Sequence, residues 1–145
     1  MEVIDIKYFN PDIIKLQKIY GEKSDWIDLR SSENVQLKKG ELKTIRLGVG
    51  MKLPKGYEAI IAPRSSTAKN FGIIQANSIG VMDNSYSGDN DEWMFLAYAI
   101  RDTEIHVNDR IAQFRIIKNQ PLIIFNEVPK LGNIDRGAFG STGTV

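Results

Sequence analysis

Residues 77–91, NSIGVMDNSYSGDND, bring together side chains that could support chemistry on a small molecule. One carboxylate, Asp83, ends the apolar run 79–82. Tyr86 follows three residues later, and Gly88 lies among turn-forming Ser, Asp and Asn residues. An antiparallel hairpin of this composition would turn a free backbone edge, one carboxylate and one aromatic ring toward the same small space. That space could read a planar base, hold a sugar against a ring and activate a water. The alternative is an ordinary surface hairpin with a polar tip.

The C-terminal residues 132–145, GNIDRGAFGSTGTV, differ in composition from the rest of the chain. They contain four glycines and only three larger apolar side chains, Ile134, Phe139 and Val145. Such a segment cannot bury enough surface to pack by itself, so we expect a mobile arm that follows a single domain at residues 1–131. Its backbone amides and hydroxyls could close around a phosphate. A disordered terminus is the alternative.

The composition limits the possible classes of protein. A chain of 145 residues with 42% hydrophobic residues can form one domain with a substantial core. A formal net charge of +1 provides no global field for nucleic acid or a membrane surface, so neither is expected as a partner. With no cysteine and a single histidine, the usual kinds of zinc site are close to excluded.

The sequence also predicts a location. The N-terminus lacks a basic stretch followed by an apolar run, and no segment approaches the ~18 consecutive apolar residues of a membrane span. We therefore expect a cytoplasmic protein.

From Trp26 onward, short apolar stretches alternate with turn signals, which predicts strands. Before them, Asn10-Pro11 resembles a helix start and Gly21 a helix end, so we expect one short helix over residues 10–21. Residues 65–70 suggest one further helical turn. Many short strands with a minor helix indicate an all-β sandwich, jelly roll or distorted β-barrel. The strands are expected at residues 2–9, 45–53, 57–62, 73–81, 93–100, 105–107, 110–117 and 122–128.

Five separated segments resemble the motifs of the trimeric dUTP pyrophosphatases (dUTPases), in the order found in that family. The segments are residues 25–30 (DWIDLR), 62–66 (APRSS), 80–88 (GVMDNSYSG), 110–113 (RIAQ) and 136–143 (RGAFGSTG). Two of them depart from the family pattern. The usual Ala-Gly before the first acid is here Trp26-Ile27, and the last motif is shortened in its middle.

The resemblance implies a jelly-roll homotrimer that hydrolyses dUTP to dUMP and pyrophosphate with Mg²⁺. Its three active sites would lie at subunit junctions, each closed by a C-terminal arm from a neighbouring subunit. Asp83 would be the general base that activates the attacking water. Tyr86 would lie against the deoxyribose and exclude a 2′-hydroxyl, while Asn77 and the adjacent backbone would read uracil.

The resemblance also assigns groups to the triphosphate, whose transfer depends on positioning and electrostatic stabilisation. Gln113 would donate to the α-phosphate, and Ser65 would lie near the oxygen that bridges the α- and β-phosphates. The residues expected to bind phosphate are Arg64, Ser65, Ser66, Gln113, Arg136, Ser141 and Thr142.

Magnesium would be held largely through substrate phosphates, so a cage of protein oxygens is not required. Asp28 is the candidate for contacting the metal's waters, although it could equally be a structural acid near Arg30. The acidic turn 89–92 lacks calcium-loop spacing and is interpreted as a solvated turn.

The aromatic side chain that stacks on uracil is open to two interpretations. The resemblance favours Phe139. However, only Ala138 separates it from Gly137, so the motif is two residues shorter here than in the family. The missing residues shorten the extended reach of the arm by roughly 7 Å. An aromatic after the hairpin, Trp93 or alternatively Phe95, could take its place.

Two other functions compete with this interpretation. A dCTP deaminase would share the fold and the Arg-Ser-Ser motif, but it would need a glutamate near position 93, which is Trp. A non-catalytic jelly-roll module that binds another protein is the second alternative. Intact Asp83, Tyr86 and Gln113 argue against lost catalysis, although a protein regulator as an additional partner is not excluded.

Overall fold

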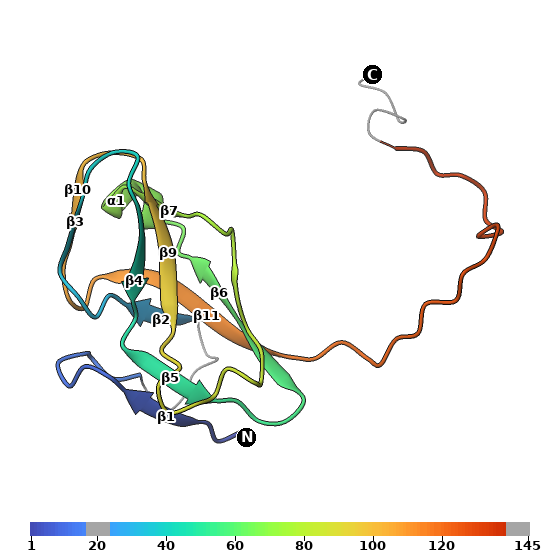
Figure 1. Cartoon of the computed structure of the whole chain (residues 1–145), viewed down its shortest axis with the longest axis horizontal. Coiled ribbons are helices and arrows are strands. Elements are labelled where there is room, and N and C mark those ends of the chain that lie inside the picture. Colours follow the sequence, from blue (N-terminus) through green and yellow to red (C-terminus); the bar gives the residue numbers. More distant parts are fainter. Residues whose placement is uncertain (17–23, 139–145) are drawn as a thin grey trace.

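The computed structural model describes residues 1–16 and 24–138, which form a β-rich body and a long C-terminal extension (Figure 1). The predicted all-β class is confirmed. The elements of the described residues are β1 (Asp5–Tyr8), β2 (Ile27–Arg30), β3 (Val35–Leu37), β4 (Leu42–Arg46), β5 (Val49–Lys52), β6 (Tyr57–Pro63), α1 (Thr67–Phe71), β7 (Ile73–Gln75), β8 (Gly80–Met82), β9 (Met94–Ala99), β10 (Thr103–Ile105) and β11 (Arg110–Lys118).

The strands pair antiparallel in four small sheets. A four-stranded sheet has the order β2-β11-β6-β8, and a three-stranded sheet has the order β4-β9-β7. The pairs β1-β5 and β10-β3 complete the body. Neighbours in a sheet are mostly distant in sequence. As a result, β11, near the end of the described body, lies between β2 and β6.

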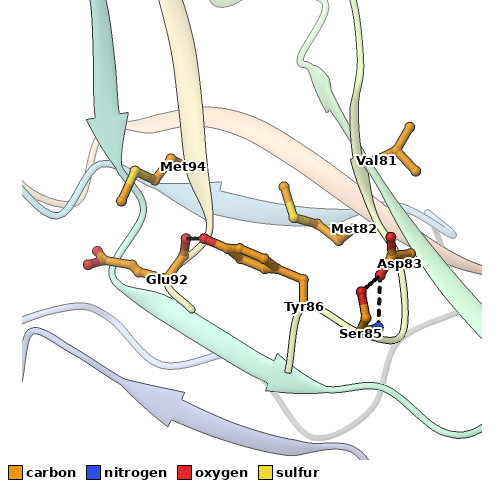
Figure 2. Close-up of a pocket in the computed structure, with 7 residues that line it drawn as sticks. All are labelled: Val81, Met82, Asp83, Ser85, Tyr86, Glu92 and Met94. Atoms are coloured by element: carbon orange, nitrogen blue, oxygen red, sulfur yellow. Dashed lines mark hydrogen bonds between the residues drawn. The ribbon is translucent and has the colours of Figure 1, made fainter. Parts of the chain in front are cut away.

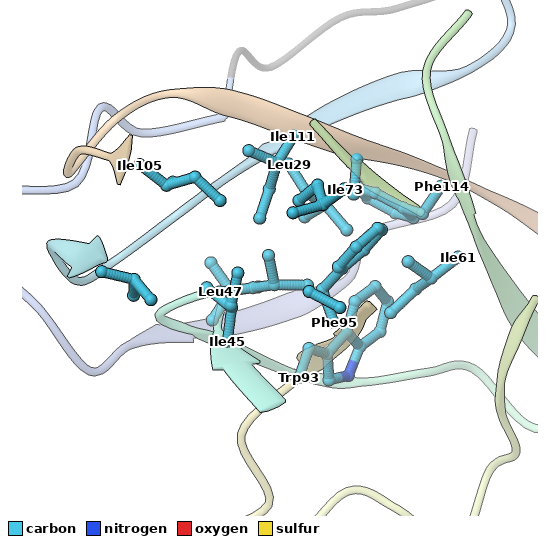
Figure 3. Packing of buried hydrophobic residues seen from close by; sticks show 14 of the residues in the cluster. Leu29, Ile45, Leu47, Ile61, Ile73, Trp93, Phe95, Ile105, Ile111 and Phe114 are labelled. Atoms are coloured by element: carbon cyan, nitrogen blue, oxygen red, sulfur yellow. The ribbon is translucent and has the colours of Figure 1, made fainter. Parts of the chain in front are cut away.

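The core lies between the larger sheets and is filled by side chains that alternate along the strands. Trp93 and Phe114 meet edge to face, with ring centroids 5.1 Å apart. Figure 3 shows Trp93, Phe95 and Phe114 packed among aliphatic side chains. Burial of these apolar side chains supplies the main driving force for the fold.

Residues 45–53, predicted as one strand, form the end of β4 and all of β5. Between them Gly48 has φ +74°, and a Cβ there would lie 2.7 Å from the Ser32 Cβ. The chain therefore turns at a position that accepts only glycine, and it passes from one sheet to another. The predicted strand 73–81 likewise divides into β7 and β8, with a turn between them.

The described residues contain one short helix, at the position where residues 65–70 suggested a further helical turn, and none at residues 10–16. Among residues 10–16, Asn10 Oδ1 accepts from the Asp12 amide at 2.9 Å and the Ile13 amide donates to the Asn10 carbonyl at 3.2 Å. These bonds make a turn and not a helix, so the prediction is wrong for these residues. Residues 17–21 lie outside the described residues. The helix of the described chain is α1, which ends at Gly72 in the left-handed conformation.

The predicted strand at 122–128 is absent, since residues 119–138 run outward as an extended segment (Figure 1). The Asn119 amide donates to the Gly56 carbonyl at 2.9 Å, the last backbone hydrogen bond between this end of the described chain and the body. Beyond it, several large apolar side chains are at least 89% exposed: Leu122, Ile124, Phe125, Leu131 and Ile134. The apolar pattern that suggested a strand therefore has no strand partner among the described residues.

No helix among the described residues is long and apolar enough to cross a membrane.

Candidate active site

The turn between β7 and β8 presents the residues expected to read a base. The Ser78 amide donates to the Gln75 carbonyl at 3.0 Å, and the Ile79 amide donates to the Asn77 carbonyl at 2.7 Å. Ser78 has φ +65°, in the left-handed region that non-glycine residues seldom occupy. Asn77 is exposed at the tip. The turn is therefore tightly folded and leaves the Asn77 side chain exposed.

Asp83 follows β8 directly and is held by its own turn. The Ser85 amide donates to Asp83 Oδ1 at 2.8 Å, and the Ser85 hydroxyl donates to the same oxygen (Figure 2). The side-chain hydrogen bond from Ser85, followed by the amide bond, lowers the pKa of Asp83 below its ordinary value. The carboxylate is therefore ionised at neutral pH, is fixed in direction and keeps its second oxygen for another partner.

Tyr86 forms one wall of a shallow pocket beside this carboxylate. Its hydroxyl donates to the Glu92 carbonyl at 2.7 Å, so the ring is fixed at both ends. Burial is the main cause that raises the pKa of Tyr86, which keeps the phenol protonated as a donor. Figure 2 shows the ring lying across the space between Asp83 and Glu92. The pocket is lined by Val81, Met82, Asp83, Ser85, Tyr86, Glu92 and Met94.

The acidic turn 89–92 is only partly the solvated turn that the sequence suggested. Asp89 and Asn90 are exposed, but Glu92 is buried. Its carboxylate accepts from the Gly48 amide at 2.9 Å and from Arg46 Nε at 3.0 Å. The interpretation is therefore wrong for Glu92, which connects the hairpin loop to the chain between β4 and β5.

A second polar cluster gathers where β2, β11 and β6 meet. Asp28 Oδ1 lies 3.0 Å from Arg64 Nε, and Asp28 Oδ2 lies 3.4 Å from the Arg110 guanidinium. Gln113 lies opposite both Asp28 and Ala62 in the sheet, and its amide donates to the Pro63 carbonyl at 3.1 Å. Three of the sequence-predicted residues, Asp28, Arg64 and Gln113, thus share one cluster, together with Arg110, for which no role was predicted.

A buried threonine supports this cluster. Thr67 Oγ1 accepts from the Arg64 amide at 2.8 Å and donates to the Ile111 carbonyl at 2.9 Å. It therefore joins the start of α1 to β6 and β11. Ser65 is exposed, and Ser66, at the helix start, makes no capping hydrogen bond through its side chain. Both hydroxyls lie next to Arg64 at the edge of the cluster.

Asp83 and the arginine cluster lie apart within the chain. Met82, just before Asp83, is opposite Ala59 of β6, whereas Gln113 is opposite Ala62. Since β8 and β11 flank β6 on opposite sides, the two groups are separated by roughly 10 Å along the strand and about 10 Å across the sheet. One chain therefore presents two partial sites.

The structure also bears on the choice of stacking aromatic. Trp93 and Phe95 are both fully buried in the core, so neither can stack on a base and that alternative is wrong. Phe139, Ser141 and Thr142 lie outside the described residues. Arg136 is described and exposed, and it belongs to the C-terminal segment 119–138, which runs away from the body (Figure 1).

The fold agrees with similarities to known proteins. The dUTPase family matches residues 19–144. A prophage-derived deoxyuridine 5′-triphosphate nucleotidohydrolase of Bacillus subtilis, YosS, is 57% identical over 97% of this chain and 98% of that protein. A deoxyuridine 5′-triphosphate nucleotidohydrolase of Thermobifida fusca is 34% identical over 97% of this chain and 78% of that protein.

Solved structures show the same fold at lower identity. A variant of the Staphylococcus bacteriophage 80alpha dUTPase, solved with dUpNHpp, aligns with a TM-score of 0.78 at 17% identity, over 99% of both chains. The dUTPase of phage phi11 of S. aureus aligns with a TM-score of 0.73 at 15% identity, over 92% of this chain and all of that one. The fold is therefore the jelly roll that the sequence indicated. This chain belongs to the dUTPase family.

Proposed function

We propose that this protein hydrolyses dUTP to dUMP and pyrophosphate by attack of a water on the α-phosphorus. The observation that carries the proposal is Asp83, an ionised carboxylate held in place by two hydrogen bonds from Ser85, with one oxygen left for a water. It directly follows β8, which begins at the turn suited to reading a base, and it lines the same pocket as the fixed ring of Tyr86. Family membership supports the choice of substrate.

Recognition of the nucleoside falls to the hairpin and Tyr86. The exposed Asn77 and the adjacent backbone would pair with uracil through its O4, N3–H and O2. Cytosine presents a donor in place of the O4 acceptor, so buried groups would be left without partners at ~1–3 kcal/mol each. Tyr86 is held by the Glu92 carbonyl, so its ring cannot yield to a ribose 2′-hydroxyl.

Asp83 acts on the water. A carboxylate that is ionised at neutral pH can orient the water opposite the leaving pyrophosphate and accept its proton as the bond to phosphorus forms. The bond that breaks joins the α-phosphorus to the oxygen bridging the α- and β-phosphates. No covalent intermediate on the protein is needed.

The triphosphate would meet the arginine cluster. Arg64 and Arg110 both contact Asp28. When the triphosphate binds, phosphate oxygens could replace the Asp28 carboxylate as the partner of both guanidinium groups, which would stay close together. Ser65, Ser66 and Gln113 would add neutral donors. Arg136, Ser141 and Thr142 would complete the set from the C-terminal arm, although the last two lie outside the described residues.

Magnesium fits this set of residues when it is held through the substrate. Among residues 1–16 and 24–138, no group of three or more His, Cys, Asp and Glu side chains is arranged to hold a metal. A cation that keeps several waters and binds mainly to phosphates needs only one or two carboxylates. Asp28 would contact its waters once its arginine partners turn to the phosphates. The bound ion would neutralise developing charge on the phosphate chain.

The same reasoning supports a homotrimer with shared sites. Asp83 and the arginine cluster are too far apart in one chain to act on one α-phosphate, so each site would combine the hairpin of one subunit with the cluster of another. The exposed apolar side chains of residues 119–138 also require a partner, since so much apolar surface is unfavourable in water. A neighbouring subunit would cover them and receive the arm.

The direct test is incubation of the purified protein with Mg²⁺ and each of dUTP, dTTP, dCTP and UTP. We expect rapid release of pyrophosphate from dUTP and far slower release from the other three. Comparable turnover of all four would refute the assignment of the substrate. A cytoplasmic location stays a prediction.

The same assay separates the rival activity, because a dCTP deaminase would release ammonia from dCTP. The buried acid beside position 93, Glu92, is occupied by the Gly48 amide and Arg46, which leaves it poorly placed to act on a base. We therefore expect no ammonia from any nucleotide.

A further inference from the structure

Gln75 is a buried polar side chain in a position that would ordinarily be apolar. It ends β7, where Ile73 and Gln75 face the core and Ile74 faces outward. Its exposed fraction is 6%, and its partner in the adjacent strand is the fully buried Ala97. Burial of an amide costs free energy unless both its donor and its acceptor find partners. Gln75 therefore needs a specific reason to occupy this place.

The partners of the amide belong to the base-reading turn. The orientation that satisfies both ends has the Gln75 nitrogen donating to the Ser78 carbonyl at 3.3 Å. In this orientation the Gln75 side-chain oxygen accepts from the Gly80 amide at 3.2 Å. The Gln75 main-chain carbonyl also accepts from the Ser78 amide at 3.0 Å. One residue thus makes three hydrogen bonds across the turn 76–79, all from its inner side.

This bracing explains how the turn keeps an unfavourable shape. Ser78 has φ +65°, and the Ile79 amide folds back on the Asn77 carbonyl at 2.7 Å. Gly80 is buried, and a Cβ there would touch both the Gln75 amide and the Ile61 Cβ at 3.4 Å. The turn is therefore held from below by a side chain that fills the space beneath it. Its exposed tip can remain rigid without any contact from a substrate.

We propose that Gln75 is a positioning residue that holds the hairpin in the shape that distinguishes uracil from cytosine. This inference rests on the proposed function, in which the same turn reads the base. Gln75 itself does not contact the nucleotide. It acts through Ser78 and Gly80, whose backbone directions set where Asn77 and the adjacent groups point. If the backbone of the turn 76–79 is rigid, it cannot adjust to a mismatched base, and selectivity for uracil over cytosine rises.

The test replaces the amide while keeping its volume. In Gln75→Met, both side-chain hydrogen bonds are lost and the space stays filled. We expect KM for dUTP to rise about tenfold, with kcat within about threefold of wild type. The preference for dUTP over dCTP in kcat/KM should fall about tenfold, the scale of one or two unpaired buried groups. Gln36→Met is the matched control, because Gln36 lies exposed on β3 and should leave all three values unchanged.

Gln75→Glu adds a readout that a merely structural role would not show. When ionised, the carboxylate can accept from Gly80 but faces the Ser78 carbonyl without a proton to donate. When protonated, it can make both bonds. The increase in KM, relative to wild type at the same pH, should therefore shrink between pH 8 and pH 5.

Each outcome decides the proposal. A Gln75→Met variant with unchanged KM and unchanged preference for dUTP would overturn it. A Gln75→Met variant that melts at a lower temperature but, while folded, keeps the wild-type KM for dUTP and the wild-type preference for dUTP over dCTP would also overturn it. Amide hydrogen exchange of the wild type gives a check that does not depend on variants folding, since rapid exchange at Gly80 would refute the brace. If the wild type itself shows no preference for dUTP over dCTP, the result refutes the proposed base-reading role of the hairpin, and not only the role of Gln75.

Discussion

The hairpin that contains Asp83 and the extended C-terminal segment differ in how their shape is determined. The hairpin is held by its own chain. Gln75 braces it from the core, Tyr86 is bonded to the Glu92 carbonyl, and the Asn84 amide donates to the carbonyls of Leu53 and Pro54, each at 2.9 Å. In the described structure residues 120–138 have no such hydrogen bonds, and they expose most of their apolar surface.

This difference separates the tasks of the two regions. A group that must orient a water or distinguish two bases gains from a geometry fixed before the substrate arrives. A segment that covers a site or joins subunits instead acquires its shape from what it contacts. We therefore expect changes in the hairpin to alter chemistry and selectivity, and changes in the C-terminal segment to alter assembly.

The largest effect should come from Asp83→Asn. The asparagine oxygen can still accept from Ser85, so the turn persists while the proton acceptor is lost. Turnover of dUTP should fall at least ~10²-fold with nucleotide binding retained. Single-turnover kinetics and equilibrium binding measure the two separately. Asp89→Asn is the matched control, since Asp89 is exposed and Lys7 contacts only its carbonyl. Near-normal turnover in Asp83→Asn would mean that the base lies elsewhere.

Mixed trimers would test whether the hairpin and the arm that complete one site come from different chains. An Asp83→Asn chain and a chain truncated after Gly132 should each be nearly inactive alone. When co-assembled, some sites would combine an intact Asp83 with an intact arm, so part of the activity should return. Mass spectrometry would verify that mixed assemblies form. Verified mixed trimers without any recovery would contradict the sharing of sites or the reach of the arm.

The apolar segment should control assembly more than folding. Replacing Leu122, Ile124 and Phe125 together by Ser removes side chains that contact little of the body. We expect sedimentation to show dissociation to smaller species, while circular dichroism of the β body is unchanged. Gln120→Ser with Asn126→Ser is the control within the same segment. A triple variant that sediments like wild type would show that these side chains do not join subunits.

The aromatic residues should divide between stability and binding. Trp93→Ala removes a fully buried side chain and should cost ~3–5 kcal/mol in unfolding free energy. Phe139→Ala should leave unfolding unchanged and weaken dUTP binding by ~1–3 kcal/mol, by analogy with stacking on nucleic-acid bases. Denaturant unfolding and calorimetric titration measure the two quantities. Unchanged dUTP affinity in Phe139→Ala would show that it only anchors the arm.

The smallest effect should be a change in the pH profile. Ser85 lowers the pKa of Asp83, so the base stays ionised to a pH below the ordinary aspartate range. Ser85→Ala removes the stronger of the two bonds, and the folded-state pKa should rise. The acid limb of kcat/KM should then move to higher pH, with little change at pH 7 to 8. Activity is compared only where both proteins remain folded. An acid limb at the wild-type position would mean that it reports another group.

The sequence pointed to candidate site residues more readily than to the residues that support them. Asp83, Tyr86 and Arg64 stand in recognisable local patterns. Gln75, Glu92 and Thr67 do not, because each acts on a partner from a different part of the chain. Glu92, for example, binds the amide of Gly48, and nothing in the local sequence indicates that pairing.

The sequence by itself determined the all-β class and the approximate positions of several strands, because alternating apolar residues and turn-forming residues act over a few neighbours. It did not indicate β2 or β3 as separate strands. It also determined which residue types are available for the reaction. Only the tertiary structure decided that Trp93 and Phe95 are buried and that the apolar residues 122–128 lie outside the body as an extended segment. Only the tertiary structure separated Asp83 from the arginine cluster across β6. Burial and proximity depend on which distant strands pair, and strand periodicity alone does not specify that pairing.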